Sequence, residues 1–209
     1  MNFTGKFMTI GNKIADLMIL NIVYIICCIP IFTIGAATTA LYSITFKMTA
    51  NTEPYIVKGF FKALKENLKQ STIIWLILLA AGSLIGLDLY FISLMPDGLS
   101  AFLKYFFIMA AIIGIMLALY IFPLTARFYN TTKMMFKNAF IMSIRHLPYT
   151  ILVLIITGIP VILMLFNVQL FVSSIIIIVL IGFSLIAYIN SFILKRVFAR
   201  YMEKEEELS

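Results

Sequence analysis

The residue types that could do chemistry are few in this sequence and lie far apart. His146 is the only histidine among 209 residues, and no cysteine or carboxylate lies near it in the sequence. Metal sites and catalytic triads need several such groups together. Cys27 and Cys28 are adjacent, too close for an ordinary disulfide, and we expect them to be packing residues. P-loop, nucleophile-elbow and HExxH motifs are absent from the sequence. We therefore expect a non-enzymatic protein without a cofactor or metal.

Two polar residues, Asp88 and Asn190, interrupt long apolar stretches and are candidate intramembrane polar sites. Acids inside membrane segments are functional candidates by default. Asp88 lies about 17 residues after Ser71, which predicts a position near the outer interface rather than the midplane. Asn190 is expected to form a hydrogen bond between helices. The two do not make the convergent polar cluster that a transporter of charged substrates needs.

Hydrophobicity determines the elements that carry these residues. From Leu147 to Leu194 the chain runs 48 residues without a charged side chain. A helix needs about 20 apolar residues to cross a bilayer. The whole sequence is 63% hydrophobic and 12% charged, with a mean hydropathy of +1.07. Helices pair all their backbone polar groups in lipid. We predict an all-α, polytopic helical membrane bundle that forms a single domain over residues 1–209.

Charged residues divide the sequence into candidate transmembrane helices. We predict six, over residues 14–29, 33–48, 71–95, 103–126, 147–166 and 169–194. The first two share one uncharged run, Leu17 to Phe46, which Pro30 interrupts. Each arm has about 16 residues, the short limit for crossing. A single bent helix, with five spans in all, is the alternative.

Lysine and arginine concentrate in three segments outside these helices. Residues 47–70, 127–146 and 195–209 hold 5, 4 and 4 basic residues, and basic segments face the cytoplasm. Six spans place 15 basic residues inside and 1 outside, whereas five spans place 13 inside and 3 outside. The sequence thus predicts a cytoplasmic C-terminus and, with six spans, a cytoplasmic N-terminus. The net charge of +7 reflects this orientation, so no nucleic-acid partner is expected.

Residues 54–70 and 131–146 have the pattern of cytoplasmic amphipathic helices. In the first, apolar and basic side chains fall on opposite faces; in the second, Phe136, Phe140 and Ile144 form the apolar face. We expect the apolar faces to lie in the lipid interface and the basic faces to meet anionic headgroups. Docking of a partner protein is the alternative. The basic residues of this lipid or partner interface are Lys58, Lys62, Lys65, Lys69, Lys133, Lys137 and Arg145.

A segment rich in small residues follows Pro30, which ends the first helix. Thr33 is predicted to be the N-cap of the next helix, and the glycine and alanines after it let helices approach closely in lipid. We predict a helix-packing motif made of Pro30, Thr33, Gly35, Ala37, Ala40 and Tyr42.

This motif resembles the YesL family of bacterial membrane proteins, which carry a Pro-x-x-Thr-x-Gly-x-Ala signature followed by Ala-Leu-Tyr. Pro30, Thr33, Gly35 and Ala37 match the first part of the signature, and residues 40–42 match the second. The resemblance extends more loosely over nearly the whole chain. The family has no established catalytic residues.

The resemblance implies an accessory protein of the bacterial cell membrane, associated with an ATP-driven (ABC) importer of carbohydrates. Membrane subunits of that transporter would be its partners, along with the lipid bilayer. A protein of another class, a substrate-capture subunit of an energy-coupled importer, has a similar size and helix number. Such a subunit needs a cavity with several convergent polar groups. The apolar segments here offer mostly Leu, Ile, Phe and Met, so we expect the accessory function.

Overall fold

All regular structure in the described part of the chain is helical. The computed structural model describes residues 3–52, 55–95, 99–166 and 168–206. Its elements are α1 (Phe3–Cys28), the 3₁₀ helix η1 (Ile31–Thr33), α2 (Ile34–Ala50), α3 (Ile56–Ser93), α4 (Leu99–Arg127), α5 (Thr132–Arg145), α6 (Leu147–Phe166), α7 (Val168–Ile177), the π-helix η2 (Ile178–Gly182) and α8 (Phe183–Glu206).

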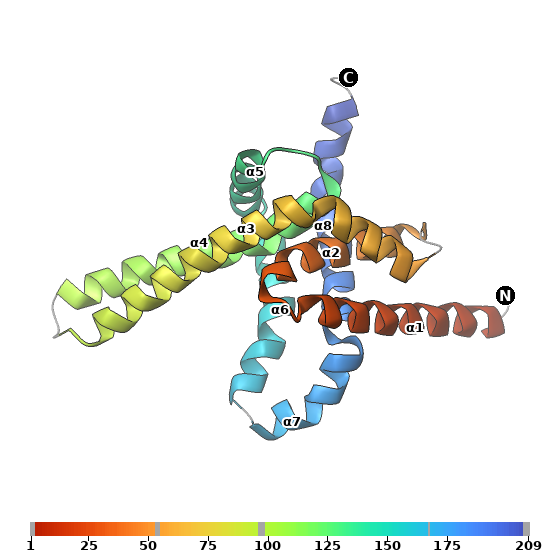
Figure 1. The fold of residues 1–209 in the computed structure, drawn as a ribbon, viewed down its shortest axis with the longest axis horizontal. Helices are drawn as coiled ribbons and strands as arrows, with labels where there is room; N and C mark the ends of the chain where they lie inside the picture. The colour runs from red at the N-terminus through yellow and green to blue at the C-terminus, as the bar shows by residue number, and fades with distance from the viewer. Residues whose placement is uncertain (1–2, 53–54, 96–98, 167, 207–209) are drawn as a thin grey trace.

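The helices form a cross-shaped molecule with α2 near its centre (Figure 1). The helices α3 and α4 run side by side into one long arm, and α1 extends in the opposite direction. The helix α6, α7 and the beginning of α8 make a second arm that points elsewhere. Both arms carry many exposed large apolar side chains, as expected of a protein whose surface meets lipid.

Within the described residues, four helical stretches are long and apolar enough to cross a membrane. They are Ile10–Cys28, Ile56–Ser93, Ser100–Arg127 and Val172–Ala199. A fifth span results only if α5 and residues Leu147–Ile162 count as one, although these two parts meet at a bend of 99°. Within the described residues the chain is therefore a multi-pass helical membrane protein with four to five candidate spans, which is fewer than the six, or alternatively five, that the sequence predicted.

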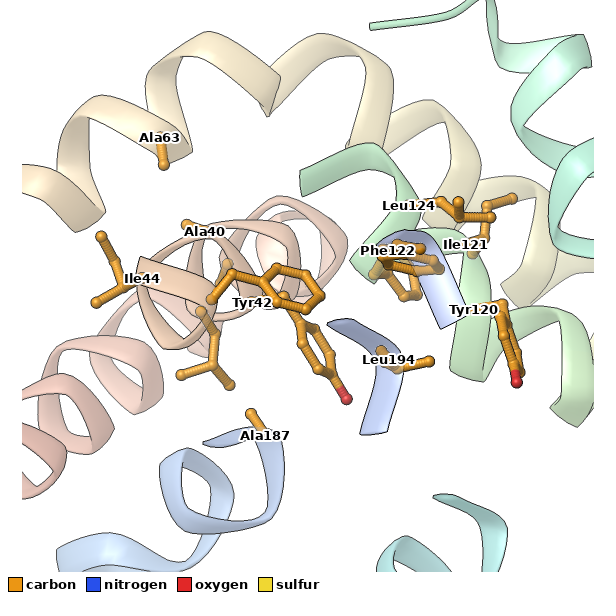
Figure 2. Close-up of a cluster of buried hydrophobic side chains, with 14 of the residues drawn as sticks. Ala40, Tyr42, Ile44, Ala63, Tyr120, Ile121, Phe122, Leu124, Ala187 and Leu194 are labelled. Atoms are coloured by element: carbon orange, nitrogen blue, oxygen red, sulfur yellow. The ribbon is translucent and has the colours of Figure 1, made fainter. Parts of the chain in front are cut away.

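The helix α2 is one predicted span that is not among these candidates. It is only 17 residues long, and 11 of these are buried. It packs against α1, α3, α4 and α8, so little of its surface could face lipid. Figure 2 shows Ala40, Tyr42 and Ile44 of α2 among side chains from α3, α4 and α8. Residues 33–48 were predicted to span the membrane because they are apolar, but apolar residues also suit a core helix enclosed by other helices.

The predicted amphipathic helix 54–70 and the predicted span 71–95 form a single helix, α3, of 38 residues. At 1.5 Å per residue, α3 is about 57 Å long. No proline or glycine separates its two halves between Phe60 and Ala81, so the helix continues without a break. Ser71, at the predicted boundary, is buried and shares a hydrogen bond of 2.9 Å with Thr39 of α2.

The remaining helices follow the sequence more closely. The predicted helix 131–146 is α5, and its N-cap Thr131 accepts a hydrogen bond from the backbone N–H of Met134. The predicted spans 103–126 and 147–166 correspond to α4 and α6. The predicted span 169–194 comprises α7, η2 and most of α8, which continues to Glu206. The extension of α8 past the apolar residues shows that a change to charged side chains does not end a helix.

Gly35 sets the distance between α2 and α3. A Cβ atom at Gly35 would lie 2.5 Å from the backbone oxygen of Ser71 and 2.5 Å from Cβ of Trp75. The first of these atoms belongs to the backbone of α3, and the second is bonded directly to that backbone. The helix α3 itself would therefore have to move. By contrast, a Cβ at Gly86, further along α3, would meet no atom within 4 Å.

We predict that Gly35→Ala destabilises the protein while Gly86→Ala does not. The first change overpacks the α2–α3 contact, at a cost of about 1–3 kcal/mol. The second replaces an open helical glycine by the best helix former, a gain of up to about 1 kcal/mol. Thermal unfolding in mild detergent measures both effects. Equal melting temperatures for Gly35→Ala and the parent would contradict the close contact.

Candidate functional site

Four lysines occupy one exposed face of the first half of α3, which we call the lysine face: Lys58, Lys62, Lys65 and Lys69. The opposite side of this segment is buried, with Phe60 at 0% and Ala63 at 4% exposure. The apolar side was expected to lie in lipid. It is covered by protein instead, because α3 packs more extensively against α2 than any other pair of helices. Leu68, expected on the apolar side, is exposed.

The positive charge of the lysine face is not neutralised by the described part of the chain. Glu66 is the only acidic residue between Ile56 and Ser71, and it is itself exposed. None of the four lysines forms a hydrogen bond or ion pair with a described residue. The lysine face is therefore available to an anionic surface outside the molecule.

The helix α5 presents a second, smaller basic surface. Its residues Lys133, Lys137 and Arg145 are exposed. The side of α5 that faces the protein is made of Met135, Ala139, Met142 and Ser143. The predicted apolar face is only partly buried, since Phe136 is half-buried whereas Phe140 and Ile144 are exposed. The small and flexible residues fit against the neighbouring helices, and the larger ones are left for lipid or a partner.

The helix-packing motif lies at the turn between α1 and α2. Pro30 is exposed in the turn, and Gly35, Ala37 and Ala40 are buried in α2. Thr33 precedes α2, but its hydroxyl does not cap that helix. It donates instead to the carbonyl oxygens of Cys27 and Pro30, each at 2.6 Å. The prediction that Thr33 caps α2 was thus wrong. Its hydroxyl instead pairs backbone oxygens at the end of α1 and in the turn, which would otherwise lack a hydrogen-bond partner.

Trp75 of α3 forms a hydrogen bond to the backbone of the same turn. Its indole N–H donates to the carbonyl oxygen of Ile31 in η1 at 2.8 Å, and its ring lies beside that of Phe122 from α4. Tyr42, the last residue of the motif, is buried in the middle of α2. Trp75 is the only tryptophan of the chain, but its type and spacing alone did not indicate this contact.

The two polar candidates within apolar segments have different environments. Asp88 is half-buried on the part of α3 that belongs to the long arm. Asn190 of α8 is completely buried, and its Nδ2 donates to the hydroxyl of Thr157 on α6 at 3.0 Å. This bond joins two helices. The two candidates lie on different parts of the molecule and do not form one site.

His146 lies at the bend between α5 and α6, where it is 9% exposed. Its Nε2 is 3.2 Å from the hydroxyl of Tyr201, and its ring also packs near Tyr149. Within the described ranges, no three His, Cys, Asp or Glu side chains come close enough to hold a metal ion. The histidine thus connects α8 to the bend.

Asn21, which was not among the predicted site residues, joins α1 to the irregular part of the last span. It is fully buried, and its Nδ2 donates to the carbonyl oxygens of Ile178 and Val179 at 2.9 and 2.7 Å. Its Oδ1 accepts from the backbone N–H of Ser184 at 2.9 Å. These partners lie in and next to the π-helix η2, where the regular α-helical hydrogen bonds are interrupted.

Ser184 completes this connection in the reverse direction. Its hydroxyl donates to the carbonyl oxygen of Leu17 on α1 at 2.7 Å. Asn21 and Ser184 thus link α1 and α8 through both side chains and backbone. A lone asparagine inside an apolar helix is the signal that could have revealed Asn21, because such residues usually bond across helices.

Part of the chain is similar in sequence to a known protein family. Residues 17–89 match a family model described as a protein of unknown function, DUF624. This stretch covers the end of α1, all of α2 and most of α3, so it includes the turn at Pro30 and the lysine face. No curated protein and no solved structure matches the chain.

We predict that Asn21→Leu lowers the free energy of unfolding by about 2 kcal/mol or more, because buried backbone groups at η2 lose their partner. Asn12→Leu makes the same replacement at an exposed position of α1 and serves as the control. Thermal unfolding in detergent compares the two variants with the parent. A parental melting temperature for Asn21→Leu would show that η2 does not depend on this side chain.

Proposed function

We propose that the chain is a non-enzymatic accessory protein of a bacterial cell membrane, which binds the membrane subunits of a carbohydrate ABC importer. The observation that carries this proposal is the lysine face of α3. It is exposed, is not neutralised by any described residue, and lies on a helix whose other side is buried in the core. A rigid charged surface of this kind suits recognition of an acidic protein surface.

The continuity of α3 supports a protein partner in the membrane. The same helix carries the lysine face in its first half and exposed apolar residues such as Leu76, Leu84 and Leu87 in its second half. A partner with a membrane helix and an acidic cytoplasmic segment could contact both halves. Lipid would cover whatever apolar surface the partner leaves.

The choice of a carbohydrate importer as the partner rests on the resemblance to YesL proteins. The matched stretch of the DUF624 family contains the residues on which this resemblance rests, from Pro30 to Tyr42. The family description itself assigns no function.

The groove between α3 and α4 is less suited to capture of a polar solute. It has a volume of about 300 Å³ and is lined by apolar and small residues, including Gly82, Ala111 and Gly114. The indole N–H of Trp75 is the polar side-chain group in this lining, and it already donates to Ile31. A capture subunit would need several free polar groups here. This difference favours the accessory function.

We propose further that the basic segments face the cytoplasm, and we predict the labelling of two single cysteines in a chain that lacks Cys27 and Cys28. Tyr129→Cys, at a position 90% exposed between α4 and α5, should resist a membrane-impermeant thiol reagent in intact cells. Leu94→Cys, at the far end of α3, should react, since its side of the membrane has few basic residues. Inside-out vesicles should give the opposite result, and the reverse pattern would contradict this orientation.

For the partner, we predict that a tagged parent chain copurifies from native membranes with a membrane subunit of a carbohydrate ABC importer. Lys65→Glu with Lys69→Glu should abolish this copurification, because acidic side chains repel an acidic partner surface. The double variant should stay in the membrane, since its apolar helices are unchanged. Quantitative mass spectrometry of the purified material measures both outcomes.

Lys65→Arg with Lys69→Arg is the matched control, because it keeps the charge at both positions. It should retain the importer subunit. If the parent captures no importer subunit, the proposed partner is wrong. If the Glu and Arg variants capture equal amounts, the contact does not use the lysine face.

A further inference from the structure

A basic pocket lies where α2 turns into α3. Three lysines line it: Lys47 from the last turn of α2, and Lys58 and Lys62 from the first two turns of α3. Thr52 and Tyr55 add two hydroxyl groups to the lining. The pocket has a volume of about 410 Å³, which falls within the range of roughly 300–1,000 Å³ typical of small-molecule sites.

The chain reversal brings the three lysines together. Asn51 ends α2 in the left-handed conformation, with φ of 54°, and its backbone N–H bonds to the carbonyl oxygens of Lys47 and Met48. Lys13 of α1 donates to the side-chain oxygen of Asn51 at 2.7 Å. This bond brings a fourth ammonium group to the residue next to Thr52. Basic residues from three helices thus lie around Asn51 and Thr52.

The charges favour an anion in this pocket. No acidic residue is among its described lining, and the sequence from Lys47 to Lys62 contains one acid, Glu53, against three lysines. Like charges around an empty pocket repel one another, and an anion between them removes that repulsion. The pocket also borders the beginning of α3, where the helix dipole is positive and no side chain caps the first turn.

The surroundings favour a lipid as the source of the anion. Tyr55, Val57 and Phe61 are exposed next to the pocket lysines of α3, and Ile10 and Ile14 are exposed on either side of Lys13 in α1. Exposed apolar side chains beside basic ones suit a position at the membrane interface, where the lysine stems cover apolar surface and the ammonium groups stay in water. Basic pockets between helices on the cytoplasmic side bind anionic headgroups. A soluble phosphate would gain nothing from the apolar neighbours.

The geometry points to a binding site for the phosphate headgroup of an anionic phospholipid, formed by Lys47, Lys58 and Lys62. The hydroxyls of Thr52 and Tyr55 supply further donors to the headgroup, and the acyl chains follow the exposed apolar side chains of α3. This site uses the two lysines of the lysine face that lie nearest the turn, whereas the partner contact is tested at the other two, Lys65 and Lys69. It differs from general attraction to anionic lipid because it holds one molecule in a defined pocket.

Native mass spectrometry of the purified full chain tests this site with phosphatidylglycerol as the probe. The parent should retain one phosphatidylglycerol molecule under conditions that remove phosphatidylcholine. Lys47→Gln with Lys58→Gln should weaken this binding about tenfold or more. Lys65→Gln with Lys69→Gln removes the same charge from α3 outside the pocket and should weaken it by about threefold or less.

Two further measurements separate the remaining possibilities. Lys47→Arg with Lys58→Arg should bind phosphatidylglycerol like the parent, which shows that the loss in the Gln variant is not caused by unfolding. Millimolar inorganic phosphate should not displace the lipid. Displacement by phosphate would identify a free anion as the ligand and overturn the proposal. Equal losses in the two Gln variants would also overturn it, because they would indicate diffuse attraction rather than a site.

Discussion

The close approach of α2 to α3 at Gly35 is the contact on which the rest of the structure depends. A helix of 17 residues with 11 buried positions has almost no surface for lipid, so its stability has to come from the helices around it. Without a hydrophobic driving force between apolar helices in lipid, tight packing and hydrogen bonds hold them together. Gly35 permits the tight packing, and the Thr39–Ser71 bond adds a polar link at the same interface.

Helix geometry is interrupted at two places in the apolar part of the molecule. At both, the unpaired backbone groups form hydrogen bonds with side chains from elsewhere in the chain. At the turn after α1, Thr33 and Trp75 donate to backbone oxygens. At the π-helix η2, Asn21 bonds to two carbonyls and one N–H. Backbone groups left unpaired in lipid are costly, so each interruption requires such a partner. These few polar residues therefore fix how α1, α3 and α8 are arranged around α2.

The sequence predicted the all-helical membrane fold because long uncharged runs have few other solutions. It predicted more spans than the described residues offer as candidates, because hydropathy cannot distinguish a helix that faces lipid from one enclosed by other helices, as α2 shows. It also separated residues 54–70 from 71–95, since charge changes there while helix propensity does not. The basic side chains of α3 were found by periodicity. Trp75 and Asn21 were not, because their importance comes from distant backbone groups that only the fold brings near.

The continuity of α3 also determines how its lysines can bind a partner. A separate amphipathic helix could rotate or detach, so its charges would adapt to any anionic surface. As the first half of a 38-residue helix packed on α2, the segment cannot rotate without breaking the core. The backbone positions of its lysines are therefore fixed: those nearest the turn line a pocket with Lys47, and those nearer Ser71 are exposed outside it. Preorganised charges lose less entropy on binding, and this favours specific recognition over diffuse attraction.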